Sequence, residues 1–288
     1  MANEKINISK TQITAGAEKP FTLLHTTDNH ICLCDERNDE RKQILAANRN
    51  RAFKGTQVEF FENALSYAKE NGYTVLSTGD ICDFVSFANF DYVKKAFEGV
   101  DYIFAVGNHE FSLYVGEAFE DEAYKMQSFD LVQKMHPGKN LRFDSRTING
   151  VNIITLDNGY YNFTAAQTAF LEKETEKGLP IILTMHNPIH NKELYDLCMS
   201  NPRAECAYLV GSPEELIKCY PEHRYIQQKP DKETLEFIEY ASHNRLIKAV
   251  IAGHLHEDYI TTLPWGDGVI QICTASGYRN MAREITII

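Results

Sequence analysis

Nearly continuous apolar runs alternate with amphipathic stretches along the first hundred residues. The runs are FTLLHTT (21–27), YTVLST (73–78) and DYIFAV (101–106), and each predicts a buried strand. Apolar positions recur at helical spacing between the first two runs, which predicts a helix over 56–71 that ends at Gly72. A second helix is predicted at about 87–98. Strands and helices in this order are typical of a parallel sheet covered by helices.

The pattern changes after residue 140. The segment LRFDSRTINGVNIITLD (141–157) contains two extended runs about Asn149 and Gly150, a pair typical of a β-hairpin, so the predicted sheet is mixed. Further helices are predicted over 164–178 and 231–244, and they lead into the apolar strands PIILTM (180–185) and LIKAVIAG (246–253). From Tyr259 onward the alternation of apolar and polar residues is typical of antiparallel strands.

These elements predict one domain over residues 21–288, preceded by a polar arm at 1–20 with at most one short strand. Residues 188–230 fit no simple pattern, although they hold three cysteines and several aromatic residues. A loop of this length inside a compact domain is usually functional. We therefore interpret 188–230 as an insertion near a site.

Composition and charge narrow the class of protein. Hydrophobic residues make up 43% of the chain and charged residues 24%, as in ordinary globular proteins. The net charge of −11, with no basic stripe, works against a nucleic-acid partner. The acidic run EAFEDEA (117–123) is interpreted as a solvated helix face.

The chain has seven cysteines, an odd number, and its first twenty residues are polar, which predicts reduced thiols and a cytoplasmic location. No stretch approaches the ~20 apolar residues that span a bilayer, so no membrane partner is expected. Cys32 and Cys34 lack a second pair with zinc-site spacing and are interpreted as loop or packing cysteines. A sharper hypothesis gives these two, and Cys82, a role in oxidation sensitivity near a metal site.

Polar side chains follow five of the predicted strands. They are Asp28 and His30; Asp80 and Asp83; Asn108, His109 and Glu110; His186; and His254 and His256. Because ligands bind at the carboxyl ends of strands in open α/β sheets, we expect these residues to gather at one edge. The glycines before Asp80, Asn108 and His254 would let the backbone turn sharply there.

This set combines carboxylates, imidazoles and an amide oxygen, which suits Mn, Fe, Zn, Co or Ni better than Ca. Two such ions ~3.5–4 Å apart can clamp a phosphoryl group and supply a hydroxide nucleophile. Each motif taken alone has an ordinary explanation as a turn or a strand-end hydrogen bond. Five motifs in order at five strand ends are difficult to obtain by chance.

The ordered motifs DNH, GDICD, GNHE, MHNP and GHLH resemble the calcineurin-like metallophosphoesterases, and the resemblance runs from about Phe21 to Thr274. It implies a four-layer α-β-β-α sandwich of two mixed sheets flanked by helices, the metallo-dependent phosphatase fold. It also implies two transition-metal ions, such as Mn, Fe or Zn. The implied ligands are Asp28, His30, Asp80 and His256 for one ion, and Asp80, Asn108, His186 and His254 for the other, with Asp80 as the bridge.

The resemblance further implies catalytic roles. His109 would stabilise the phosphoryl oxygens or protonate the leaving group, while Asp83 and Glu110 would orient their neighbours. The implied reaction is hydrolysis of a phosphate mono- or diester by a hydroxide held between the ions. The acidic net charge and the insertion favour a small phosphoester. Candidate substrate contacts are Asn158, Tyr160, Arg224 and Arg279, with Tyr161 and Tyr278 beside them.

Several alternatives stay open within this resemblance. Asp83 stands where a purple acid phosphatase would have its ligand tyrosine, which disfavours that branch. A cyclic-nucleotide phosphodiesterase, a nucleotide or sugar phosphatase and a protein phosphatase share these motifs, and a nuclease is a further alternative that the acidic charge disfavours. The same fold could also serve as a non-catalytic binding scaffold.

Overall fold

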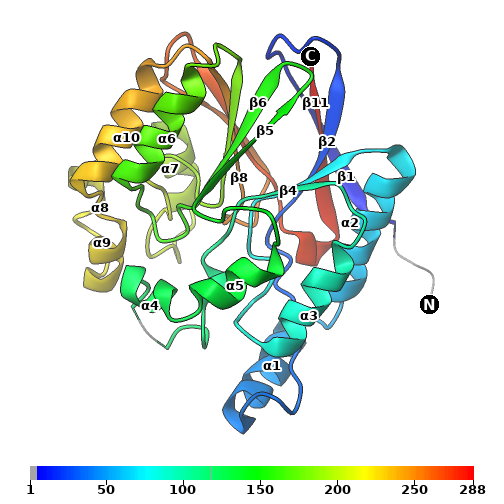
Figure 1. Cartoon of the computed structure of the whole chain (residues 1–288). Coiled ribbons are helices and arrows are strands. Elements are labelled where there is room, and N and C mark those ends of the chain that lie inside the picture. Colours follow the sequence, from blue (N-terminus) through cyan, green and yellow to red (C-terminus); the bar gives the residue numbers. More distant parts are fainter. Residues whose placement is uncertain (1–4, 118) are drawn as a thin grey trace.

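Two mixed β-sheets lie face to face, with helices on both outer sides (Figure 1). The computed structural model describes residues 5–117 and 119–288. The first sheet has the order β1-β11-β2-β3-β4 and the second the order β5-β6-β7-β8-β10-β9. The strands of the first sheet are β1 (Asn7–Ile13), β11 (Met281–Ile287), β2 (Phe21–Thr26), β3 (Thr74–Ser77) and β4 (Tyr102–Phe104). Those of the second are β5 (Phe143–Ile148), β6 (Val151–Leu156), β7 (Ile181–Met185), β8 (Ile247–Ala252), β10 (Val269–Cys273) and β9 (Tyr259–Leu263).

Helices cover the outer face of each sheet. The N-terminal half supplies α1 (Glu40–Ala52), α2 (Gln57–Asn71), α3 (Phe87–Ala96), α4 (Glu122–Met126) and α5 (Phe129–Met135). The C-terminal half supplies α6 (Ala165–Thr175), α7 (Lys192–Met199), α8 (Glu214–Ile217), α9 (Glu222–Gln228) and α10 (Lys232–His243). In Figure 1, α2 and α3 lie outside the first sheet, while α6 and α10 lie outside the second. The predicted four-layer sandwich is confirmed.

The central strands read as continuous apolar runs because both of their faces are buried. Successive side chains point to opposite faces, so Leu23 packs between the sheets whereas Leu24 packs under the first layer of helices. In the second sheet, Ile182 faces the first sheet and Leu183 faces the outer helices. Parallel pairing aligns β2, β3 and β4, and also β6, β7, β8 and β10. Their carboxyl ends therefore meet at one edge of the molecule.

Most of the predicted elements are confirmed. Helices α2, α3, α6 and α10 lie within one to three residues of their predicted bounds. Asn149 and Gly150 have φ values of 46° and 79°, as a type I′ hairpin turn requires. Thr164 caps α6 through a reciprocal hydrogen-bond pair with Gln167.

Two interpretations change. Seven residues of the predicted arm form β1, which pairs with β11 along its whole length, so that part of the arm belongs to the first sheet. The acidic run 117–123 is not a helix face, since α4 begins only at Glu122 and Glu117 and Glu120 line the cleft described below. Within the described residues, no helix is both long and apolar enough to cross a bilayer.

Candidate metal centre

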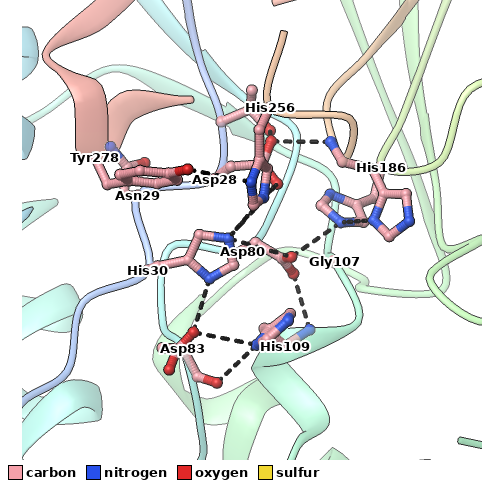
Figure 2. Close-up of polar contacts among 12 residues, drawn as sticks. Asp28, Asn29, His30, Asp80, Asp83, Gly107, His109, His186, His256 and Tyr278 are labelled. Atoms are coloured by element: carbon pink, nitrogen blue, oxygen red, sulfur yellow. Dashed lines mark hydrogen bonds and ion pairs between the residues drawn. The ribbon is translucent and has the colours of Figure 1, made fainter. Parts of the chain in front are cut away.

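The candidate residues meet at the shared carboxyl edge of the two sheets (Figure 2). Asp28 and His30 follow β2, Asp80 follows β3, His186 follows β7, and His254 follows β8. Three groups of possible ligands form there, and in each the ligand atoms lie within 4.8 Å of one another; two of them contain the candidate ligands alone, and the third combines His30 with Asp83 and His109. The structure thus brings together residues separated by more than two hundred positions.

The first cluster consists of Asp28, His30 and His256. The Nε2 atoms of the two histidines face each other at 3.0 Å. Asp28 Oδ1 lies 3.3 Å from His256 Nε2 and 3.8 Å from His30 Nε2. This buried oxygen has no hydrogen-bond partner among the described residues. A buried carboxylate oxygen that faces two imidazole nitrogens fits a cation, because it needs a positive partner.

The second cluster centres on His186. Its Nε2 atom lies 3.1 Å from Asp80 Oδ2, 3.1 Å from Asn108 Oδ1 and 3.1 Å from His254 Nδ1. Asp80 Oδ2 also lies 4.0 Å from His30 Nε2, so this carboxylate stands between the clusters. Two nitrogens with two oxygens form the mixed donor set that transition metals accept.

The other ring nitrogen of each histidine has its own partner. His186 Nδ1 donates to the Thr78 carbonyl at 2.7 Å, and His30 Nδ1 lies 2.9 Å from Asp83 Oδ1. His254 Nε2 lies 2.8 Å from the Tyr161 hydroxyl, and His256 Nδ1 lies 3.4 Å from that of Tyr278. Such partners fix the orientation and tautomer of metal-binding histidines. Tyr161 and Tyr278 therefore hold rings of the site, which differs from the substrate contact expected from the sequence.

The surroundings of the two carboxylates at the centre of the site favour their ionised form. Burial alone would raise the pKa of Asp28, but His256 and the neighbouring imidazoles outweigh it and hold the pKa well below its usual range. Burial also opposes ionisation of Asp80, and His186 and His109 outweigh it in the same way. Burial lowers the pKa of His254, which favours its neutral, metal-binding form.

Five candidate ligands have a left-handed backbone conformation. The φ values are 52° at Asp28, 50° at His30, 53° at Asp80, 68° at His254 and 61° at His256. Each such residue costs roughly 1–2 kcal/mol. Strain of this kind persists where the surroundings fix it, and it is typical of functional sites.

The glycines beside the ligands differ from expectation. Of the three, only Gly79 has a positive φ, 94°. Gly107 and Gly253 are required because neighbouring atoms leave no room for a Cβ. A Cβ on Gly107 would lie 2.2 Å from Asp80 Oδ1, and one on Gly253 would lie 1.9 Å from Thr27 Oγ1. A Cβ on Gly79 would also lie 2.2 Å from Gly107 N, so close approach of the chains explains all three glycines and the turn is a second reason at Gly79.

Asp83 and Glu110 lie behind the ligands. Glu110 accepts hydrogen bonds from the backbone N–H groups of Asp80, Ile81, Cys82 and Gly107, and so ties the loop after β3 to the loop after β4. Asp83 lies 2.9 Å from His30 Nδ1 and 3.4 Å from His109 Nδ1. Through these contacts, Glu110 can orient the loops that carry the candidate ligands, and Asp83 can orient the rings of His30 and His109.

Helix α1 supplies an arginine that the sequence interpretation missed. Arg49 donates to Asp83 through Nε at 2.6 Å and Nη2 at 2.7 Å. The next turn brings Phe53 against His30, with ring centres 5.2 Å apart and nearly parallel planes. Only proximity in the fold links Arg49 to Asp83, since thirty-four residues separate them.

A cleft of about 1240 Å³ opens in front of Asp80, Asn108 and His109. One wall is the loop that includes Glu117 and Glu120, and the other is built from the 188–230 segment, including Cys198, Tyr208 and Arg224. The Tyr208 ring lies 5.6 Å from the His254 ring. The segment interpreted as an insertion therefore lies beside the site.

The proposed substrate contacts separate into two groups. Arg224 lines the cleft, but Asn158 is fully buried and exchanges hydrogen bonds with Asn187, so it holds two loops together. Tyr160 borders a separate cavity of about 460 Å³. Arg279 binds Glu257 at 2.7 Å and the His256 carbonyl at 3.2 Å, outside the cleft lining. Of these four residues, Arg224 lies in the cleft lining and the other three lie outside it.

The cysteines near the site are poorly suited to redox chemistry. Cys32 and Cys82 are buried, and burial raises the pKa of both thiols. Burial also raises the pKa of the half-buried Cys34. Reactive cysteines need a thiolate and solvent access, so the structure favours the interpretation as packing cysteines.

Comparison with known proteins gives a family and a fold. The family model described as calcineurin-like phosphoesterase matches residues 21–258. No curated protein matches the chain in sequence. In structure, the chain is similar to a dimetal phosphatase from Danio rerio, with a TM-score of 0.50 and 13% identity over 92% of this chain and 91% of that one.

Two further solved structures are similar at lower scores. One is a 5′-nucleotidase from Candida albicans, with a TM-score of 0.43 and 13% identity over 94% of this chain and 47% of that one. The other is a phosphopantetheinyl hydrolase from Mycobacterium tuberculosis, with a TM-score of 0.40 and 15% identity over 91% of this chain and 95% of that one. At such identities, structural likeness shows the fold alone.

Proposed function

Because this chain belongs to the calcineurin-like phosphoesterase family, we propose that it hydrolyses phosphate esters of small molecules with two transition-metal ions. The observation that carries the proposal is the pair of ligand clusters joined by Asp80. Asp28 Oδ1 supports it, since a bound cation would supply the partner that this buried oxygen lacks among the described residues.

The donor atoms divide between two ions. One ion would be held by Asp28, His30, Asp80 and His256, and the other by Asp80, Asn108, His186 and His254. Mn, Fe and Zn all suit this set of nitrogen and oxygen ligands. Ions at such a site lower the pKa of water and offset the charge of a phosphoryl group.

His109 is placed to donate a proton to the leaving group. Its Nδ1 lies 2.8 Å from the Asp83 carbonyl, an arrangement that leaves Nε2 for a substrate in the cleft. Burial lowers the pKa of His109, but Asp80 and the hydrogen bonding with Asp83 outweigh it and raise the pKa to about 10. An imidazole fixed in this way, with Nε2 left for the substrate, suits general acid catalysis.

The walls of the cleft support a small substrate. The 188–230 segment closes one side of the site, and the net charge of −11 disfavours a long polyanion. We also propose that residues 21–288 act as one domain, which β1 of the arm joins by pairing with β11. A cytoplasmic location is proposed on the seven cysteines, all of them free thiols.

The test is a substrate screen with Mn²⁺ supplied, covering phosphomonoesters, phosphodiesters, cyclic nucleotides and phosphoproteins. We expect hydrolysis of small esters that is lost in Asp80→Asn and kept in Asp267→Asn, a control on an exposed turn. Metal analysis should find near two ions per chain in the wild type. Absence of bound metal and of hydrolysis would favour the binding scaffold, and cleavage of supercoiled plasmid would favour a nuclease.

A further inference from the structure

One wall of the cleft carries an arginine whose donors are largely unused. Arg224 on α9 donates through Nη1 to Gln227 Oε1 at 2.9 Å, while its buried Nε has no hydrogen-bond partner among the described residues. The Nε and Nη2 edge of a guanidinium can bind two oxygens of a carboxylate or phosphate together. Arg49 uses this edge on Asp83. In Arg224 the same edge has no hydrogen-bond acceptor among the described residues, and its Nε is covered in part by Glu205.

Neighbouring side chains hold this guanidinium in place. Gln227 also donates through Nε2 to Glu120 at 3.1 Å, so a single amide connects Arg224 to the opposite wall. The guanidinium carbon lies 5.0 Å from the centre of the Tyr208 ring. A group that is already fixed loses little conformational entropy when a ligand binds.

Arg224 lines the same cleft as Asp80, Asn108 and His109. Tyr208 contacts the guanidinium, and its ring centre lies 5.6 Å from that of His254. Within the described part of the chain, Arg224 has no hydrogen bond or ion pair with any candidate metal ligand. A phosphoryl group held at those ligands would therefore leave Arg224 free to meet the leaving group of the ester.

Glu205 covers the free edge loosely. Its Oε2 lies 3.6 Å from Arg224 Nε, longer than a hydrogen bond, and 56% of the Glu205 side chain is exposed. An exposed ion pair of this geometry contributes little stability. A better-placed oxyanion can therefore displace Glu205 at small cost.

Resting on the phosphoesterase function above, we propose that Arg224 selects substrates whose leaving group carries a second oxyanion, either a carboxylate or a second phosphate. Glu205 takes the place of that oxyanion when no substrate is bound. The cleft volume of about 1240 Å³ leaves room for such a group beyond the phosphoryl site. A substrate with an uncharged leaving group would leave the Arg224 edge unused.

Two matched substrate pairs test the proposal with Mn²⁺ supplied. They are glycerol 3-phosphate with 3-phosphoglycerate, and fructose 6-phosphate with fructose 1,6-bisphosphate. We expect wild-type kcat/KM to favour the second member of at least one pair, and the pair that responds identifies carboxylate or phosphate as the recognised group. Arg224→Ala should reduce that preference about tenfold or more, because a charge-assisted bidentate contact is lost.

Two further variants separate recognition from damage to the fold. Arg224→Lys keeps the charge without the two-pronged edge, so its preference should lie between those of Arg224→Ala and the wild type. Glu205→Gln should raise the preference, since it removes the competing carboxylate. Arg245→Ala, an exposed arginine outside the cleft lining, should leave the preference unchanged.

Three results would overturn the inference. The first is a wild type that hydrolyses p-nitrophenyl phosphate and prefers neither oxyanion substrate. The second is an equal fall in kcat/KM for both members of a pair in Arg224→Ala, which would place Arg224 on the scissile phosphate. The third is a lower preference in Glu205→Gln. Failure to hydrolyse any phosphoester, p-nitrophenyl phosphate included, would instead refute the proposed function, and this inference with it.

Discussion

At the residue scale, Asp83 contacts both a candidate metal ligand and the candidate general acid. Its Oδ1 lies 2.9 Å from the ring of the candidate ligand His30 and 3.4 Å from that of the candidate acid His109. Burial raises the pKa of Asp83, but hydrogen bonds from Arg49 and the two histidines outweigh it and keep the pKa well below its usual range. One buried carboxylate thus orients both rings, and Arg49 balances its charge.

Replacing Arg49 with alanine should leave this carboxylate poorly compensated and the two rings less well fixed. We expect kcat to fall about tenfold or more and metal affinity to weaken by 10–100-fold, as for other partners of metal-bound histidines. Metal titration by calorimetry measures the second effect independently of turnover. Arg49→Lys should keep part of the wild-type kcat and metal affinity. Arg51 is exposed on the same helix, so Arg51→Ala should change neither kcat nor metal affinity. Wild-type metal affinity and kcat in Arg49→Ala would refute the positioning role.

His109→Ala tests the assignment of the acid. We expect kcat to fall 10²–10⁴-fold, the usual contribution of general acid catalysis, with metal content nearly intact. The fall in kcat should be smaller for p-nitrophenyl phosphate than for an alkyl phosphate, because a good leaving group needs less protonation. Loss of metal with activity spared would show that His109 is a ligand instead.

The sequence identified the candidate ligands because each follows an apolar strand, and strand ends can be read from the chain. Arg49 could not be found in this way, since its partner Asp83 is a neighbour only in the folded protein. The surroundings of Asn158 were also beyond prediction. It follows β6, is fully buried, and its amide exchanges hydrogen bonds with the backbone of Asn187.

At the scale of elements, buried strands and amphipathic helices were predictable because an apolar face leaves a periodic trace. Helix α1 leaves none, because Lys42 and Ala46 are its only buried residues. Its N-cap Asp39, which accepts from the Lys42 backbone N–H, is a signal that could have located it. The short helices of 188–230 were missed, although Asn191 caps α7 and Pro213 and Pro221 stand directly before α8 and α9.

The loops after β3 and β4 approach so closely that glycine is required between them. In Gly107→Ala the new Cβ would lie 2.2 Å from Asp80 Oδ1, so the carboxylate or its loop must move. We expect loss of metal binding at both clusters, because Asp80 stands between them and is the proposed ligand of both ions. Gly99→Ala is the matched control: its φ of 73° makes alanine strained, but no atom lies within 4 Å, so stability should fall without loss of metal. Metal analysis of both variants distinguishes crowding from backbone strain.

For the whole molecule, a buried neutral histidine links stability to pH. Burial lowers the pKa of His136 to about 3, and its ring stacks on Phe104 at 3.8 Å. The unfolded chain takes up a proton near the usual histidine pKa of about 6.5, whereas the folded protein does not. The contribution of neutral His136 to the free energy of unfolding is therefore fully present above a pH of about 6.5. It is lost as the pH falls from there toward 3, by roughly 1.4 kcal/mol per pH unit.

His136→Phe should remove this contribution to the pH dependence. Urea unfolding at pH 7.0 and 5.5 should show a loss of stability on acidification that is about 1.4 kcal/mol smaller in the variant than in the wild type. His243→Gln, with 75% of the wild-type side chain exposed, should show the wild-type loss. An equal loss in wild type and His136→Phe would mean that His136 takes up its proton without unfolding.

Metal binding should stabilise the whole fold, because the ligands come from both sheets and meet only in the native state. A cation at a hundred times its dissociation constant contributes about 2.7 kcal/mol per site. For a chain of this size that corresponds to a Tm rise of roughly 5–10 °C. We therefore expect Mn²⁺ to raise the Tm of chelator-treated protein by this amount or more. Asp80→Asn should lose most of the rise and Asp267→Asn none, whereas a wild-type Tm indifferent to Mn²⁺, Fe²⁺ and Zn²⁺ would contradict the metal centre itself.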